Sequence, residues 1–232
     1  MKTWTTKSRY AIAQVLGGRS NAFLLRHGGR NVLVDTGRQK DRADLQHRLQ
    51  DLRVDLLDYL VLTHTHFDHT ENAAFLQKKY GAKVLVHESE AGFLQAGLSQ
   101  LPAGTLLPTK LLAALFAHRM ASGLTYEPCC PDVLVEEGLD LTDFGPSARL
   151  IHTPGHSRGS ISLIVDDEIA LVGDAMFGVF PCTIFPPFAD DVPQLISSWG
   201  RLLETGCRLF LPGHGSADNR RLVEKAYTRR RR

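Results

Sequence analysis

The sequence predicts an α/β fold built on a mixed, partly parallel β-sheet. Short apolar runs typical of buried strands alternate along the chain with segments of helical spacing. A helix between two strands favours parallel neighbours, which is the first argument for this class. The second is size, because 232 residues can bury a large core without disulfides or metals. We expect one domain over residues 1–232.

The elements of the first half follow from these patterns in order. Residues 31–34 form an apolar run after the Gly-rich turn at 27–30, which is typical of a hairpin strand. Residues 41–52 place leucines on one helical face, so we expect a helix there. The remaining expected elements of this half are a strand at 59–62, a helix at 71–80 that ends at Gly81, and a strand at 83–86.

The second half begins with a segment that breaks the alternation. Residues 90–131 carry leucines interrupted by Pro and Gly, and we interpret them as a helical insertion that forms either a lid or a dimer surface. Residues 220–232 form a basic tail, and we expect its tetra-arginine end at 229–232 to be disordered and solvated. Between them we expect strands at 149–153, 160–165, 169–172 and 209–211, and a helix at 193–204 with Pro in its first turn.

Composition and charge exclude several classes of protein. The chain is 43% hydrophobic and 22% charged, which is typical of an ordered globular protein. The net charge is +2, but the basic tail holds the positive excess, and an acidic body with a basic end is not typical of a nucleic-acid-binding fold. No apolar run reaches the roughly 20 residues of a membrane span. The four cysteines lack CxxC spacing, and no secretory leader is visible, so we expect a reduced, cytoplasmic setting.

The most informative motif is Thr-His-Thr-His-Phe-Asp-His-Thr at residues 63–70. It follows an expected strand and precedes an expected helix, which puts it in a loop at a strand's carboxyl end. In an extended loop His64 and His66 project to the same side, so they can share one metal ion. Asp68 and His69 follow after the chain turns, so they can face a second ion. Imidazole and carboxylate together suit zinc, iron or manganese.

Three later segments have the same form, a short apolar strand followed by a tight turn with one ligand-type residue. The ligand-type residues are His156, Asp174 and His214, and a glycine directly precedes each of them. Glycine lets the backbone bend sharply and approach a bound group closely. Because all four ligand segments follow strands, we expect them to converge at one edge of a sheet.

This ordered set of motifs resembles the metallo-β-lactamase superfamily of hydrolases. The resemblance extends from the Asn-Val-Leu-Val-Asp-Thr-Gly run at 31–37 to the Pro-Gly-His-Gly run at 212–215. It implies an αββα sandwich of two mixed sheets flanked by helices, with a two-metal site between the sheets. An Asp at position 174 resembles the glyoxalase II, lactonase and RNase Z branches rather than the β-lactamase branch, which has Cys there.

The resemblance also implies which residues bind each metal. The first ion would be held by His64, His66 and His156, and the second by Asp68, His69 and His214. Asp174 would bridge both ions, which are most typically zinc, with iron or manganese as alternatives. Two such ions would outweigh the charges of Asp68, Asp174 and a bridging hydroxide, and so leave a positive site suited to an oxyanion. Coordination lowers the pKa of water from about 15.7 to about 7, so hydroxide exists at neutral pH.

We therefore expect a dinuclear hydrolase of a small carboxylic ester, thioester or lactone, with Asp68 as the proton donor to the leaving group. The alternatives are a nucleic-acid phosphodiesterase and a signalling or scaffold protein that keeps the metal site with little turnover. The expected partner is a small-molecule substrate rather than nucleic acid or membrane. The sequence does not fix the oligomeric state, and a homodimer is one alternative. Four phenylalanines follow Asp174 and form either an apolar substrate wall or part of the core: Phe177, Phe180, Phe185 and Phe188.

Overall fold

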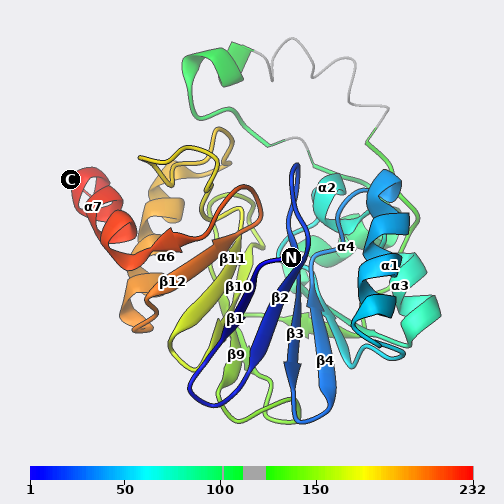
Figure 1. Cartoon of the computed structure of the whole chain (residues 1–232). Coiled ribbons are helices and arrows are strands. Elements are labelled where there is room, and N and C mark those ends of the chain that lie inside the picture. The colour runs from blue at the N-terminus through cyan, green and yellow to red at the C-terminus, as the bar shows by residue number, and fades with distance from the viewer. Residues whose placement is uncertain (101, 112–123, 232) are drawn as a thin grey trace.

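The computed structural model describes residues 1–100, 102–111 and 124–231, and in these residues two β-sheets pack face to face (Figure 1). The first sheet has the order β1-β2-β3-β4-β5-β6-β7, and the second has the order β13-β12-β11-β10-β9-β8. The strands of the first sheet are β1 (Thr3–Thr5), β2 (Ala11–Leu16), β3 (Ala22–His27), β4 (Arg30–Val34), β5 (Tyr59–Val61), β6 (Lys83–His87) and β7 (Val133–Val135). Those of the second are β8 (Gly138–Asp140), β9 (Ala148–His152), β10 (Ile161–Val165), β11 (Ile169–Gly173), β12 (Leu209–Pro212) and β13 (Asp218–Asn219).

Helices cover the outer face of each sheet. In Figure 1, α1, α3 and α4 lie on the side of the first sheet, whereas α6 and α7 lie on the side of the second. The bounds are η1 (Gln39–Asp41), α1 (Arg42–Asp51), α2 (Phe67–Thr70), α3 (Ala73–Tyr80), α4 (Glu88–Ala96), α6 (Val192–Glu204) and α7 (Arg220–Arg230). None of the described helices has the length and apolar content needed to cross a membrane.

Both sheets are mixed, as predicted. In the first sheet, β1 to β4 pair antiparallel and β4 to β7 pair parallel. In the second sheet, β11 and β12 pair parallel and the other neighbours pair antiparallel. The parallel run from β4 to β6 contains the helical crossovers that the alternation of strands and helices predicted.

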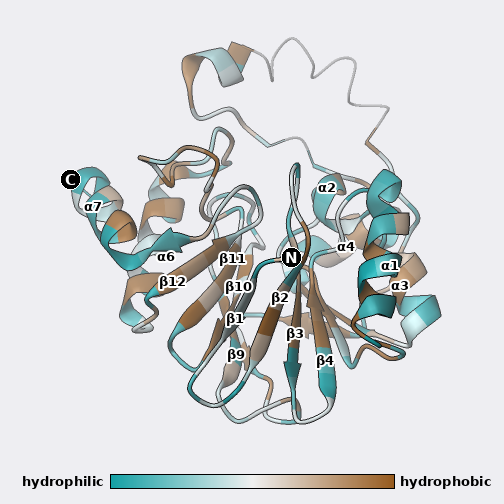
Figure 2. Ribbon diagram, in the orientation of Figure 1, coloured by the Kyte–Doolittle hydropathy of each residue, from teal (hydrophilic) through white to brown (hydrophobic). Residues whose placement is uncertain are grey.

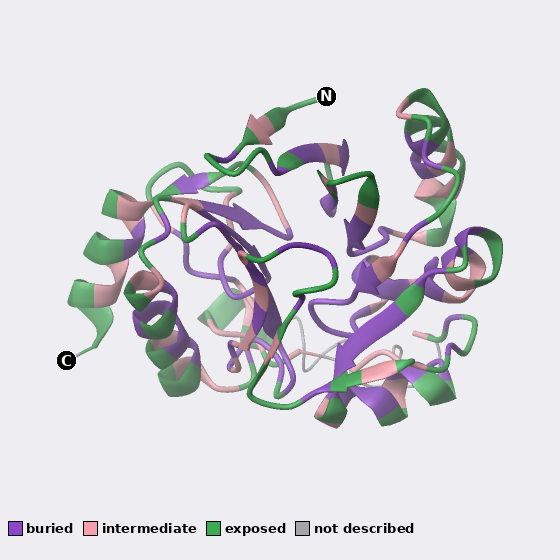
Figure 3. Ribbon diagram, turned by 90° about the horizontal axis from the view of Figure 1, so that it is seen from below, coloured by how far each residue is buried: buried purple, intermediate pink, exposed green. Residues whose placement is uncertain are grey.

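The core is divided into three layers, which confirms the αββα sandwich. One apolar cluster lies between the first sheet and its helices, and includes Leu45 of α1 and Leu76 of α3. A second lies between the two sheets, where Leu25 and Leu163 contribute from opposite sides. A third lies between the second sheet and α6, centred on Trp199. The apolar strands and the polar outer faces of the helices are visible in Figure 2, and Figure 3 shows the buried interior of both sheets.

The bounds of most predicted elements are confirmed within two residues. The loop between β5 and α3 differs from the prediction. The helix expected at 71–80 begins at Ala73, and part of the expected loop at 63–70 is the short helix α2. This helix starts after His66, which has extended backbone angles, so the ligand motif crosses from an extended loop into a helical turn. Strands β1, β2, β3, β7, β8 and β13 were not predicted, and three of them have only three residues and one has two.

The basic tail at 220–232 is helical over most of its described part, so the expected disorder of its arginine end is wrong for residues 229–230, which are exposed but helical. Residues 220–230 form α7, which packs against α6 and buries Val223 in the third core layer. The Asn219 side chain caps the helix by accepting a hydrogen bond from the Leu222 amide at 3.0 Å. The Arg230 guanidinium lies 3.9 Å from the ring centroid of Phe185, so this exposed arginine also packs against the fold.

The expected insertion at 90–131 lies partly outside the described residues. Its first part belongs to α4, which packs on β6 and β7 and is therefore an integral layer of the sandwich. Residues 102–111 lie beside the loop at 186–190, where the Thr105 amide donates to the Pro187 carbonyl at 3.0 Å and the Ala189 amide donates to the Ala103 carbonyl at 2.8 Å. This loop carries Phe188, which contacts the candidate site.

Candidate metal centre

The seven predicted ligand-type residues meet at the carboxyl ends of four strands. β5 of the first sheet leads into residues 63–70, whereas β9, β11 and β12 of the second lead to the other three ligand-type residues. β9 and β11 both pair antiparallel with β10, and β12 pairs parallel with β11, so these three strands point the same way. The prediction of one sheet edge is therefore corrected, because both sheets contribute to the site.

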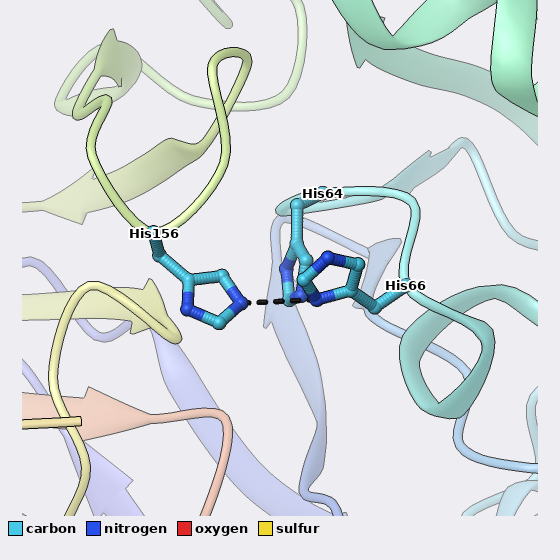
Figure 4. A group of neighbouring side chains, drawn as sticks. All are labelled: His64, His66 and His156. Carbon is cyan, nitrogen blue, oxygen red and sulfur yellow. Dashed lines mark hydrogen bonds between the residues drawn. The ribbon is translucent and has the colours of Figure 1, made fainter. Parts of the chain in front are cut away.

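A first group of nitrogen donors is formed by His64, His66 and His156, which are all buried (Figure 4). The His66 Nδ1 and His156 Nε2 atoms lie 3.0 Å apart. The His64 ring stands edge-on to both partners, with centroid distances of 4.5 Å to His66 and 4.7 Å to His156. Three imidazole nitrogens thus converge on one point, which is the donor arrangement of a metal pocket.

A second group is formed by Asp68, His69 and His214. The Nε2 atoms of the two imidazoles are 3.3 Å apart. The Asp68 Oδ2 atom lies 3.4 Å from the His214 Nε2 and 3.8 Å from the His69 Nε2. Asp68 and His69 sit on α2, and the His69 ring also lies beside His64 of the first group, with ring centroids 4.3 Å apart, so the two groups are adjacent.

Asp174 lies between the two groups. Its Oδ2 atom is 3.6 Å from the His156 Nε2 of the first group and 3.2 Å from the His214 Nε2 of the second. Its Oδ1 atom is 3.5 Å from the His69 Nε2. One carboxylate therefore faces both groups, as a bridging ligand must.

Most of these imidazoles are oriented from behind through their second nitrogen. The His69 Nδ1 lies 2.9 Å from the Asp35 carboxylate, and the His156 Nδ1 lies 3.0 Å from the Phe188 carbonyl. The His214 Nδ1 donates to the Arg19 carbonyl. A donor role for Nδ1 leaves Nε2 as the atom with a free lone pair that points into the site, which is the usual tautomer of a metal-binding histidine.

The unsatisfied atoms of the site fit divalent cations. Among the described residues, His64 Nε2, His66 Nε2 and Asp174 Oδ1 are buried and have no hydrogen-bond partner. A buried polar atom without a partner destabilises the fold by about 1–3 kcal/mol. A cation bound by these lone pairs would remove that cost, so the donor set fits the metals that its chemistry favours.

The electrostatics of the first group favour the neutral form of His64 and His66. Burial lowers the pKa of both His64 and His66 well below the usual value, and the neighbouring imidazoles lower them further. Neutral imidazole is the form that binds a metal.

The carboxylates around the second group raise the pKa of its two histidines. Burial opposes protonation of His69, but Asp174, Asp68 and Asp35 outweigh it and raise its pKa to about 10. The pKa of His214 is likewise raised, since Asp174 outweighs burial. Conversely, the cationic imidazoles outweigh burial and hold the pKa of Asp174 well below its usual range. A metal cation between these carboxylates would balance their negative charge in place of the protons on His69 and His214.

The structure brings together all seven residues that the sequence singled out, while their role as metal ligands stays a prediction. Asp35, in the turn after β4, contacts the His69 Nδ1. His87 and His152, at the ends of β6 and β9, stack on each other with ring centroids 4.1 Å apart. Sequence reasoning missed Glu90, because a single Glu on an expected helix carries no distinguishing signal.

The phenylalanines after Asp174 divide between the two expected roles. Phe185 is buried and packs edge-on against Trp199, with ring centroids 6.2 Å apart, so it belongs to the core. Phe177 lies beside His214 with a centroid distance of 5.0 Å, and the exposed Phe180 lies next to it at 6.4 Å. These two side chains form an apolar surface beside the second group.

Comparison with known proteins gives the same assignment as the motifs. The model of the metallo-beta-lactamase superfamily matches residues 15–214. The chain is 31% identical to the metallo-beta-lactamase fold-containing protein ST1585 of Sulfurisphaera tokodaii, over 84% of this chain and 72% of that protein. It is 27% identical to a probable metallo-hydrolase of Methanocaldococcus jannaschii, over 88% of this chain and 91% of that protein.

Solved structures share the fold. The superfamily protein from Sulfolobus tokodaii superposes with a TM-score of 0.67 at 24% identity, covering 94% of this chain and 85% of that one. The structure of TTHA1623 in a di-iron-bound form superposes with a TM-score of 0.65 at 25% identity, covering 92% of this chain and 96% of that one. The sequence motifs, the three-layer core and the relatives all lead to the same family. The chain belongs to the metallo-beta-lactamase superfamily.

Proposed function

We propose that this protein is a dinuclear metal-dependent hydrolase that cleaves a small carboxylic ester, thioester or lactone. The observation that carries the proposal is the convergence of seven ligand-type side chains, three of which have a buried polar atom without a hydrogen-bond partner in the described part of the chain. The first ion would be held by the three-histidine group, the second by Asp68, His69 and His214, and Asp174 would bind both.

The chain's own residues have distinct tasks in this reaction. When bound, the two ions supply Lewis-acid activation of water and of the scissile carbonyl. The Asp35, Phe188 and Arg19 oxygens hold the ligand imidazoles in the tautomer that binds metal. The Asp68 side chain is 20% exposed, which lets it reach a substrate, so it is the residue that we assign to protonating the leaving group.

Two relatives favour a thioester or ester among the substrate classes. The chain is 29% identical to a hydroxyacylglutathione hydrolase of Acidiphilium cryptum, over 68% of this chain and 49% of that protein. It is 22% identical to an atrochrysone carboxyl ACP thioesterase of Aspergillus fumigatus, over 88% of this chain and 56% of that protein. The apolar pair Phe177 and Phe180 beside His214 suits an acyl group.

Zinc is the first choice of metal, and iron is the second. Histidine nitrogen and carboxylate oxygen bind either ion. The di-iron form of TTHA1623 is a solved example of iron in this fold. Metal analysis of the purified protein separates the two.

The test is turnover of a substrate panel by zinc-loaded and iron-loaded protein. The panel holds thioesters, lactones, β-lactams and phosphodiesters, and we expect turnover of the first two classes. His66→Ala should lose metal and at least 100-fold of the activity, because it removes one of the three donors of the first group. His47→Ala is the matched control, since His47 is an exposed histidine on α1. Full activity in His66→Ala contradicts the proposal, and turnover of phosphodiesters alone favours the nuclease alternative.

A further inference from the structure

Glu90 is a buried carboxylate that the proposed reaction does not use. It lies in the first turn of α4, and its exposed fraction is 1%. Among the described residues it forms no ion pair with Lys, Arg or His. A buried carboxylate without a cation is retained only where hydrogen bonds stabilise it, so its contacts indicate its purpose.

Among the described residues, the hydrogen bonds of the Glu90 carboxylate go to the two loops that carry the three-histidine group. The Oε2 atom accepts from the Thr65 amide at 3.1 Å and from the Thr65 hydroxyl, and the Oε1 atom accepts from the Gly159 amide at 3.1 Å. Thr65 lies between His64 and His66, and Gly159 lies three residues after His156. One side chain therefore joins the loop of two ligands to the loop of the third.

Both loops approach Glu90 closely. A Cβ atom at residue 159 would lie 2.4 Å from the Glu90 Cγ, so only glycine admits this approach. The three donors are two backbone amides and a hydroxyl, and a carboxylate can accept from all of them. An amide at position 90 keeps one acceptor oxygen and turns a donor NH₂ toward one of the loops, which repels that loop.

Asp35 has the corresponding place on the other flank of the site. Its carboxylate accepts from the Thr63 amide at 2.8 Å and contacts the His69 Nδ1 at 2.9 Å. It touches a ligand of the second group, whereas Glu90 touches only the loops of the first. Asp35 therefore acts directly on the second group and, through the Thr63 hydroxyl 3.1 Å from the His64 Nδ1, also on the loop of the first, whereas Glu90 acts on the loops of the first group alone.

We propose that Glu90 is a positioning residue for the three-histidine group, which fixes the spacing between the His64–His66 loop and the His156 loop and so sets the affinity of that pocket for its cation. This inference rests on the proposed metal-dependent function. A residue outside the ligand shell that orients the ligands changes metal affinity by about 10- to 100-fold. Because Glu90 touches no ligand of the second group, the effect should be confined to the first pocket.

The test is zinc binding by Glu90→Gln, measured against a competing chelator. We expect one of the two binding steps to weaken about 10- to 100-fold and the other to stay at the wild-type affinity. Imidazole NMR signals then identify the weakened pocket, since the affected signals should belong to His64, His66 and His156. Glu88→Gln is the control, because Glu88 is an exposed carboxylate on the same helix, and it should bind zinc like the wild type.

Thr65→Val gives a second, milder perturbation of the same contact. It removes the hydroxyl donor to Glu90 and keeps the backbone amide, so it should weaken the same pocket by a smaller factor. If Glu90→Gln does not fold, the zinc affinity of Thr65→Val tests the positioning role of Glu90. Wild-type affinities in both variants, or equal weakening of both pockets, overturn the role of Glu90. Wild-type protein that binds no zinc or iron overturns the proposed function, and with it this inference.

Discussion

Replacing Asp35 by Asn tests how the second half of the centre is held. Asp35 has a φ of 59°, in the left-handed region that few residues adopt. Asparagine is among the residues that tolerate this region best, so the backbone should not move. The substitution therefore removes a charge and an acceptor while it keeps the shape, and the result can be read as the effect of the carboxylate.

The magnitude follows from the three contacts of this carboxylate. The Thr63 amide and hydroxyl donate to it at 2.8 Å each, and the His69 Nδ1 lies 2.9 Å from it. Hydrogen bonds to a charged group contribute about 1.5–3 kcal/mol each, and asparagine retains an acceptor on one side only. We expect the unfolding free energy to fall by about 2–4 kcal/mol. Without a fixed His69 tautomer, zinc affinity of the second pocket should fall about 10- to 100-fold.

The assay is a zinc titration with a competing chelator, combined with chemical denaturation of the metal-free protein. Asp51→Asn is the control, because Asp51 is exposed on α1 and its one ion pair among the described residues is with His47. Unchanged zinc affinity in Asp35→Asn would refute the argument that outer carboxylates orient the ligands.

Three further predictions concern stability, packing and metal removal. Burial raises the pKa of Asp218 to about 6, so ionisation of this carboxyl opposes folding. The unfolding free energy of the wild type should therefore fall as the pH rises from about 4 to 6. In urea denaturation at pH 7, Asp218→Asn should be more stable than the wild type by about 1–2 kcal/mol. A Cβ at residue 213 would lie 2.3 Å from the Asp174 Oδ1, so Gly213→Ala should weaken zinc binding at least about 10-fold in chelator competition, whereas Gly92→Ala, with no atom within 4 Å, should bind normally. Chelation should abolish turnover and lower the melting temperature, with recovery on adding zinc; turnover that survives chelation contradicts the metal mechanism.

Local patterns predicted most of the fold because its elements are marked in the chain itself. The strands β4, β5, β6 and β9 to β12 are apolar runs next to turn residues, and α6 begins with a proline in its first turn. The short strands β1, β7 and β8 were not predicted, since three residues are too few to establish an alternation. Their strand geometry depends on pairing with neighbours that are distant in sequence.

The site was predictable at the residues that have a recognisable chemical identity. His64, His66 and the later His156 stand out by spacing and order, and the structure brings them together. Glu90 and the Arg19 carbonyl were not predictable, because their importance comes from contacts across the fold rather than from their neighbours in sequence. The helix α7 was not predicted for a similar reason: Val223 among many arginines becomes buried only because α6 offers an apolar face.

The most direct test of the central claim is anomalous diffraction from crystals of the zinc-loaded protein. The account predicts two zinc peaks, one within the group of His64, His66 and His156 and one within the group of Asp68, His69 and His214, with Asp174 touching both. Absence of zinc from this place, or a single ion bound elsewhere on the protein, would contradict it.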